Sequence, residues 1–193
     1  MNLGIFGGSF SPVHLGHYQI VRQILALGQV DRILVVPAYQ SPFKLDQEPL
    51  DSELRLSMLR ATFADLANAQ IELYEMNRTE VSYTAHSLRH FSRAYPDDHL
   101  FLILGEDAFA HFPQWFEALE ILKMARLLVF RRHLSSPPDL SQATQFAGDR
   151  VQWLDLDLPP VSSTKIRGGS LTDLVEQNWL HPEALKLWMS SHH

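Results

Sequence analysis

Short runs of apolar residues recur along this chain, and segments with helical periodicity separate them. The clearest runs are residues 32–37, 99–104 and 126–130, each with a continuous apolar centre. A strand that is apolar on both sides is typical of a parallel sheet covered on both faces. Strands that alternate with helices favour an α/β architecture. We therefore predict a Rossmann-like, doubly wound parallel sheet with helices on both faces.

The other segments complete this prediction within one domain that covers residues 1–193. We expect further strands at 71–74 and 151–156, helices at 51–66 (with Asp51 as N-cap), 82–95 and 116–124, a polar surface excursion at 134–149, and a small C-terminal helical segment. Ligands of such sheets sit beyond the carboxyl ends of the strands. The polar clusters that follow the strands should therefore gather along one edge.

The beginning of the chain combines a strand, a glycine turn and a helix. Residues 3–6 are apolar and predict a strand that begins almost at residue 1. Gly7 and Gly8 then let the backbone turn tightly and approach a ligand without interference from a Cβ atom. After Pro12, apolar residues follow helical spacing.

His14 and His17 fall at or near the start of this helix, three residues apart and so on one face. A helix start offers unpaired N–H groups and a partial positive charge, which suit an anion such as phosphate. Two imidazoles would add directional donors aimed at the same anion. Two histidines at this spacing can also bind zinc, but no carboxylate is adjacent. We predict a phosphate site and no resident metal.

Two strings carry a resemblance to a known family. GGSFSPVHLGH at 7–17 resembles the signature GG-(T/S)-F-D-P-x-H-x-GH of the adenylyltransferase branch of the nucleotidyltransferase superfamily, and SSTKIR at 162–167 resembles its second signature. The family's G-x-D…P-x-W pattern fits residues 105–115, and its SYT segment fits 82–84. From residue 3 to at least 167, the chain is similar to bacterial nicotinate-mononucleotide adenylyltransferases.

The resemblance implies transfer of AMP from ATP to nicotinate mononucleotide, giving deamido-NAD and pyrophosphate in NAD biosynthesis. It also implies Mg²⁺, held mainly by the ATP phosphates. The residues that it assigns to catalysis are His14, His17 and Arg167. Those that it assigns to ATP are Gly7, Gly8, Ser9, Phe10, Lys44, Gly105, Asp107, Arg132, Ser163 and Thr164. Those that it assigns to the acceptor are Tyr83, Thr84 and Trp115, whose ring would stack on the pyridine.

The second string also has a local meaning. Ser163 or Thr164 can cap a helix while hydroxyl and N–H groups face a phosphate. Arg167 would then project from the first helical turn as a permanently charged donor fork. Lys44 lies in the proline-containing loop 38–49, and the stretch 37–49 is a candidate lid over the site.

Two positions depart from the family pattern. Ser11 stands where the family has Asp, and Phe43 stands where it usually has His before the basic residue. Three alternatives stay open. One is a sister transferase that uses nicotinamide mononucleotide or another phosphate acceptor, the second is a non-catalytic nucleotide-binding module, and the third is a zinc hydrolase.

Charge and composition limit the partners. The formal net charge of −6 argues against general nucleic-acid binding, because that function requires a basic surface. The chain has no cysteine, so disulfides and thiolate metal sites are excluded. It contains no apolar run of membrane-spanning length and no pattern of a cleaved leader. We expect a cytoplasmic protein, with homo-oligomerisation left open.

Overall fold

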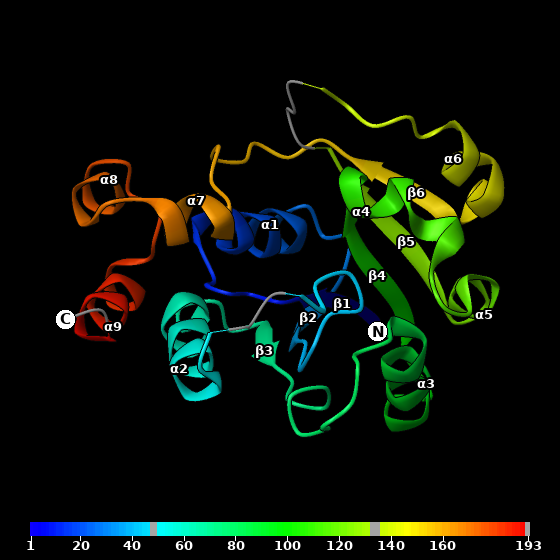
Figure 1. Cartoon of the computed structure of the whole chain (residues 1–193). Helices are drawn as coiled ribbons and strands as arrows, with labels where there is room; N and C mark the ends of the chain where they lie inside the picture. Colours follow the sequence, from blue (N-terminus) through cyan, green and yellow to red (C-terminus); the bar gives the residue numbers. More distant parts are fainter. Residues whose placement is uncertain (47–49, 132–135, 192–193) are drawn as a thin grey trace.

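A six-stranded, entirely parallel sheet forms the centre of the computed structural model, which describes residues 1–46, 50–131 and 136–191. The strand order is β3-β2-β1-β4-β5-β6. The strands are β1 (Asn2–Gly8), β2 (Arg32–Pro37), β3 (Ala69–Ile71), β4 (His99–Gly105), β5 (Ala125–Phe130) and β6 (Val151–Leu154). The predicted doubly wound parallel sheet is confirmed (Figure 1).

Helices lie between the strands and continue beyond the last of them. They are α1 (Leu15–Ala26), α2 (Ser52–Phe63), α3 (Thr84–Ala94), α4 (Glu106–Ala110), α5 (Ala118–Met124), α6 (Ser141–Ala147), α7 (Ser163–Gly168), α8 (Leu171–Glu176) and α9 (Pro182–Ser191). Two short 3₁₀ helices, η1 (Phe112–Gln114) and η2 (Gly148–Arg150), precede α5 and β6. Figure 1 shows α7, α8 and α9 grouped near α1 and α2, away from α3, α5 and α6.

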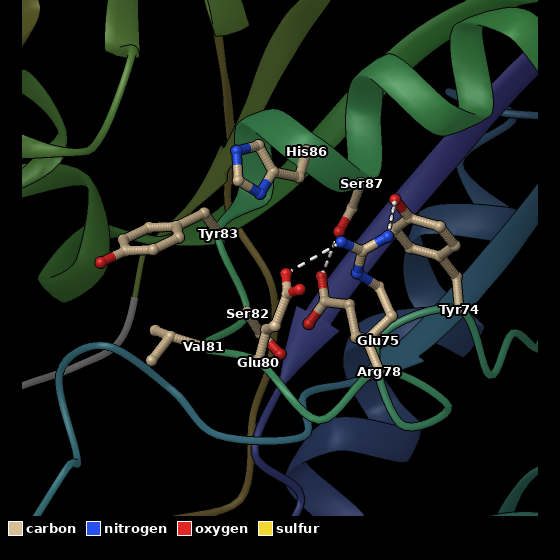
Figure 2. Close-up of a pocket in the computed structure, with 9 residues that line it drawn as sticks. All are labelled: Tyr74, Glu75, Arg78, Glu80, Val81, Ser82, Tyr83, His86 and Ser87. Carbon is tan, nitrogen blue, oxygen red and sulfur yellow. Dashed lines mark hydrogen bonds and ion pairs between the residues drawn. The ribbon is translucent and has the colours of Figure 1, made fainter.

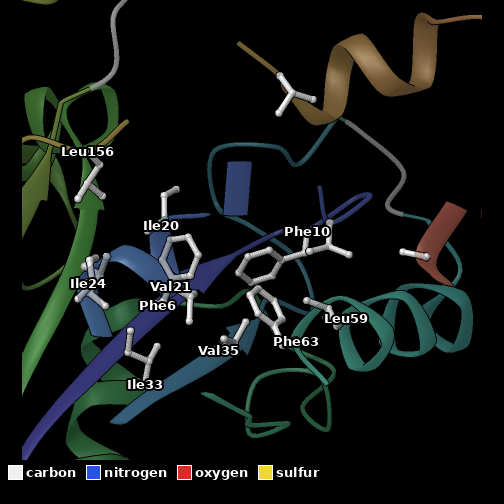
Figure 3. Packing of buried hydrophobic residues seen from close by; sticks show 14 of the residues in the cluster. Phe6, Phe10, Ile20, Val21, Ile24, Ile33, Val35, Leu59, Phe63 and Leu156 are labelled. Carbon is white, nitrogen blue, oxygen red and sulfur yellow. The ribbon is translucent and has the colours of Figure 1, made fainter. Parts of the chain in front are cut away.

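Successive strand residues enter two separate cores, one on each face of the sheet. In β2, Ile33 and Val35 pack with α1, α2 and the C-terminal helices, as Figure 3 shows for the two side chains among their neighbours. Leu34 and Val36 point to the opposite face, which α3, α4, α5 and α6 cover. Because both faces are dry, the strand is apolar at every central position.

Two predicted segments differ from the structure. The expected strand at 71–74 is β3, which ends at Ile71. The expected surface excursion at 134–149 is wrong, because it contains α6, whose Ala143 and Ala147 are buried against the sheet. Small alanines in a polar stretch give a weak periodic signal, and only packing identifies them as core.

The strand order reverses between β1 and β4. These two strands are neighbours in the sheet, although α1, α2, α3 and two strands separate them along the chain. The chain leaves β1 at Gly8 and β4 at Gly105, and these connections go to opposite faces of the sheet. A parallel sheet binds its ligand at such a switch point. In the described part of the chain, no helix is long and apolar enough to cross a membrane.

Candidate functional site

The predicted histidine pair lies at the start of α1. His14 is the N-cap residue, and α1 begins at Leu15. The backbone N–H of His14 donates to Nδ1 of His17 at 3.2 Å. This hydrogen bond places the proton of a neutral His17 ring on Nε2. The expected position of both residues on one face of a helix start is confirmed.

The two imidazoles stack, with ring centroids 3.7 Å apart and planes inclined by 26°. Phe10 meets the His17 ring edge-on at 4.9 Å, and His14 is only 2% exposed. A Cβ on Gly16 would lie 2.9 Å from His14 Nδ1, so this position accommodates the ring only because it is glycine. His17 is half-buried and is the more accessible of the two rings.

Residues 7–10, which precede this pair, differ in exposure and in the space around them. Gly7 is exposed, and a Cβ built on it would meet nothing within 4 Å. A Cβ on Gly8 would meet the Phe10 ring at 3.0 Å. Phe10 has a φ of 43° and is 2% exposed. Its ring therefore belongs to the core beneath His17, and only its backbone is suited to contact a nucleotide.

Carbonyl groups of the loop between β1 and α1 are held by distant side chains. Arg167 Nη1 donates to the carbonyl of Ser11, and Ser163 Oγ donates to the carbonyl of Pro12 at 2.9 Å. The N–H of Leu50 donates to Ser11 Oγ at 3.0 Å. The two signature strings, about 150 residues apart, thus meet through direct hydrogen bonds.

Local details of the second signature differ from the prediction. The N-cap of α7 is Ser162, whose Oγ accepts from the N–H of Lys165 at 3.2 Å, and Ser163 and Thr164 are the first two helical residues. The Ser163 hydroxyl instead holds Pro12, because packing against α1 brings that carbonyl within reach. Arg167 lies in the last turn of α7, not the first.

Three predicted charged residues are electrostatic neighbours. Burial lowers the pKa of the Lys44 ammonium, the nearby Arg167 lowers it further, and the Asp107 carboxylate raises it. Asp107 lies in the first turn of α4 beside Gly105, which is the N-cap residue. Lys44 from the loop after β2, Asp107 from α4 and Arg167 from α7 thus come to one region. Arg132 lies outside the described residues.

The predicted acceptor residues line an aromatic region next to this one. Tyr83 is the N-cap of α3 without a side-chain hydrogen bond to the helix, and Thr84 is the first helical residue. Trp115 is the C-cap residue that follows η1, and its ring centroid lies 5.8 Å from that of Phe43. Phe116 approaches the Tyr83 ring at 4.9 Å. Phe43, which replaces the family's histidine, packs here on the predicted pyridine platform.

Sequence reasoning missed Arg55 of α2. Its side chain is 1% exposed, and Nη1 donates to the carbonyl of Ser9 at 3.0 Å. Burial lowers the pKa of its guanidinium. The available signal was its position three and four residues before Met58 and Leu59, on the apolar stripe of the helix. An arginine on such a stripe indicates that the guanidinium donates to a hydrogen-bond acceptor inside the protein.

The described residues contain no group of three or more histidine or carboxylate side chains that could hold a metal ion. The stacked histidine pair therefore has no third ligand of this kind among them. A zinc site normally needs three or four protein ligands, so the arrangement does not suit a zinc hydrolase. It is compatible with a cation that arrives on a triphosphate.

The sequence profile of the cytidylyltransferase-like family matches residues 5–169. The chain belongs to this family. Among its curated relatives, a "probable nicotinate-nucleotide adenylyltransferase" of Thermotoga maritima is 35% identical over 167 residues, 86% of this chain and 80% of the relative. A relative with the same name in Shewanella is 30% identical and aligns over 96% of this chain and 95% of its own length.

Solved structures agree with the cytidylyltransferase-like fold. Nicotinic acid mononucleotide adenylyltransferase of Plasmodium falciparum, complexed with NaAD, superposes with a TM-score of 0.80. The match covers 98% of this chain and 95% of that protein at 16% identity. At this identity the likeness supports the fold, and the function rests on the site and the sequence relatives.

Proposed function

We propose that this protein is an adenylyltransferase that transfers AMP from ATP to nicotinate mononucleotide. The observation that carries the proposal is the union of the two signatures, in which Arg167 and Ser163 bind carbonyls of the loop directly before His14. Relatives at 30–35% identity over most of the chain carry the matching name.

The reaction needs no general base, because the acceptor's phosphate is already anionic at neutral pH. One of its oxygens attacks the α-phosphorus of ATP, a P–O–P linkage forms, and the bond to the leaving pyrophosphate breaks. The enzyme must align the two nucleotides and stabilise the charge on the transferred group. His17 Nε2–H, the Arg167 guanidinium and Lys44 are the donors that we assign to this task.

The acceptor would bind beside the start of α3. The backbone N–H groups of its first turn receive no side-chain cap at Tyr83, and such groups suit the carboxylate of a nicotinate ring. Trp115 would supply an aromatic face for that ring. The preference for the acid over the amide is therefore assigned to Tyr83 and Thr84.

We propose that Mg²⁺ accompanies ATP and is held mainly by its phosphates. When bound, the ion neutralises charge on the triphosphate. Asp107, near Lys44 and Arg167, is the carboxylate suited to approach it. The remaining task of the protein is to hold the α-phosphate against the start of α1.

The decisive assay measures pyrophosphate release with Mg-ATP and nicotinate mononucleotide, beside nicotinamide mononucleotide. We expect turnover on the acid, and a loss of about 10²–10³ in kcat for His17→Ala, as for removal of an oxyanion donor. Turnover on the amide alone would keep the chemistry and contradict the assigned pocket. ATP binding with no release from either acceptor would contradict the proposed activity.

A further inference from the structure

Glu75 is a buried carboxyl group outside the phosphate site. It lies between β3 and α3, is only 9% exposed, and lines a pocket together with Ser82, Tyr83 and Ser87 (Figure 2). Burial raises the pKa of this carboxyl, and hydrogen bonds from Ser87 and Ser82 oppose the rise. Burial of a carboxyl group costs free energy unless hydrogen bonds compensate for the lost water.

Two serine hydroxyls converge on this carboxyl. Ser87 Oγ donates to Glu75 Oε1 at 2.5 Å, and Ser82 is its second hydroxyl partner. Ser82 Oγ also accepts from the backbone N–H of Tyr39 at 3.0 Å. A hydroxyl has one proton and can accept as well as donate, so Ser82 can accept from Tyr39 while it donates to Glu75.

The two serines flank the predicted acceptor residues in the sequence. Ser82 directly precedes Tyr83, and Ser87 lies in the first turn of α3, which begins at Thr84. The backbone N–H of Ser82 also donates to the carbonyl of Gln40 at 2.9 Å. One carboxyl therefore holds both sides of the acceptor segment and, through Ser82, the loop that follows β2.

We propose that Glu75 is a positioning residue that holds Ser82 and Ser87 on either side of Tyr83–Thr84 and thereby sets the affinity for the pyridine mononucleotide. This inference rests on the proposed function. Glu75 acts through the two serines and contacts neither ATP nor the reacting phosphates. Its removal should loosen the acceptor segment and leave the site at the start of α1 intact.

The test is steady-state kinetics with each substrate varied in turn. For Glu75→Ala we expect KM for the accepted pyridine mononucleotide to rise about tenfold, as for the loss of one to two hydrogen bonds, with KM for ATP and kcat unchanged within about threefold. Glu75→Gln keeps the shape and an acceptor oxygen and should recover most of this affinity. Ser87→Ala should shift the same constant in the same direction, by less.

Glu80→Gln is the matched control, because Glu80 is an exposed carboxyl of the same pocket that pairs with Arg78 at 2.9 Å. It should leave both KM values unchanged. If Glu75→Ala does not fold, Ser87→Ala still decides, because it removes the hydroxyl that donates to Glu75. Equal changes in both KM values, or an unchanged KM for the pyridine mononucleotide in folded Glu75→Ala or Ser87→Ala protein, would overturn the inference alone. Wild-type protein that is silent with both acceptors would overturn the proposed function and this inference together.

Discussion

The imidazole rings of His14 and His17 stack at 3.7 Å while the N–H of His14 donates to Nδ1 of His17. His14 therefore fixes the orientation of the His17 ring in two ways, by ring stacking and by a hydrogen bond from its backbone N–H. In this arrangement His17 has two tasks that substitution can separate. Its Nδ1 accepts the hydrogen bond from the N–H of His14 at the start of α1. Its Nε2–H is the donor that we assign to the reaction.

His17→Asn should separate these tasks, because the amide oxygen can take the place of Nδ1 as acceptor while no group replaces Nε2. We expect a loss of about 10²–10³ in kcat with nearly native stability. His17→Ala should lose similar activity and also about 1 kcal/mol of unfolding free energy, because the His14 N–H loses its acceptor. Pyrophosphate release and urea unfolding measure the two effects. Near-native activity of His17→Asn would remove this ring from the mechanism.

Gly16→Ala should misplace the histidine pair. The new Cβ would lie 2.9 Å from His14 Nδ1 and 3.3 Å from Val161, so the ring must shift. A displacement near 1 Å can cost about 10² in rate, and we expect a loss of that order in kcat. Gly168→Ala is the control, because its Cβ would meet nothing within 4 Å. A fully active Gly16→Ala protein would show that the stack is not required.

Ser11→Asp should be tolerated, although Ser11 is a departure from the family signature. Ser11 Oγ accepts from the N–H of Leu50 at 3.0 Å, and a carboxylate can accept the same bond. We expect kcat within about threefold of wild type for Asp, and for Ala a loss of about 1 kcal/mol in stability. Melting curves and kinetics of both variants provide the test. A strong gain in rate for Asp would mean that serine limits catalysis.

The raised pKa of Glu75 should make the free energy of unfolding depend on pH. Its pKa is raised in the folded protein, mainly by burial. Between the ordinary glutamate value and the raised one, the folded state keeps a proton that the unfolded chain has released. The contribution of Glu75 to stability therefore falls as pH rises through this interval.

Glu75→Gln should remove this component. Its unfolding free energy, relative to wild type, should increase from about pH 4 upward and level off above the raised pKa. Urea titrations across this range, with Glu80→Gln beside them, measure the difference. A constant difference at all pH values would contradict a raised pKa.

Chelation of Mg²⁺ should abolish turnover without changing the melting temperature of the ligand-free protein. The described residues offer no group of three metal ligands, so we assign the ion to the nucleotide. Thermal unfolding with and without EDTA, in the absence and presence of ATP, is the check. A fall in the melting temperature without nucleotide would reveal a protein-bound metal.

The sequence by itself determined the α/β class, most of the strands, the helix start at His14 and His17, and the Asp51 cap, whose Oδ1 accepts from Glu53 and Leu54. These features depend on periodicity, turn chemistry and residues close together in the chain. The family resemblance added the second signature, although the cap fell one residue earlier than predicted, at Ser162.

Only the tertiary structure decided which distant groups meet. Arg167 reaches the Ser11 carbonyl across 156 positions, Arg55 reaches that of Ser9 across 46, and Phe43 packs on Trp115. Hydrophobic periodicity reports which face of an element is buried, but not what lies opposite it. The partner of a buried polar group is set by how the layers pack, and that information is spread over the whole chain.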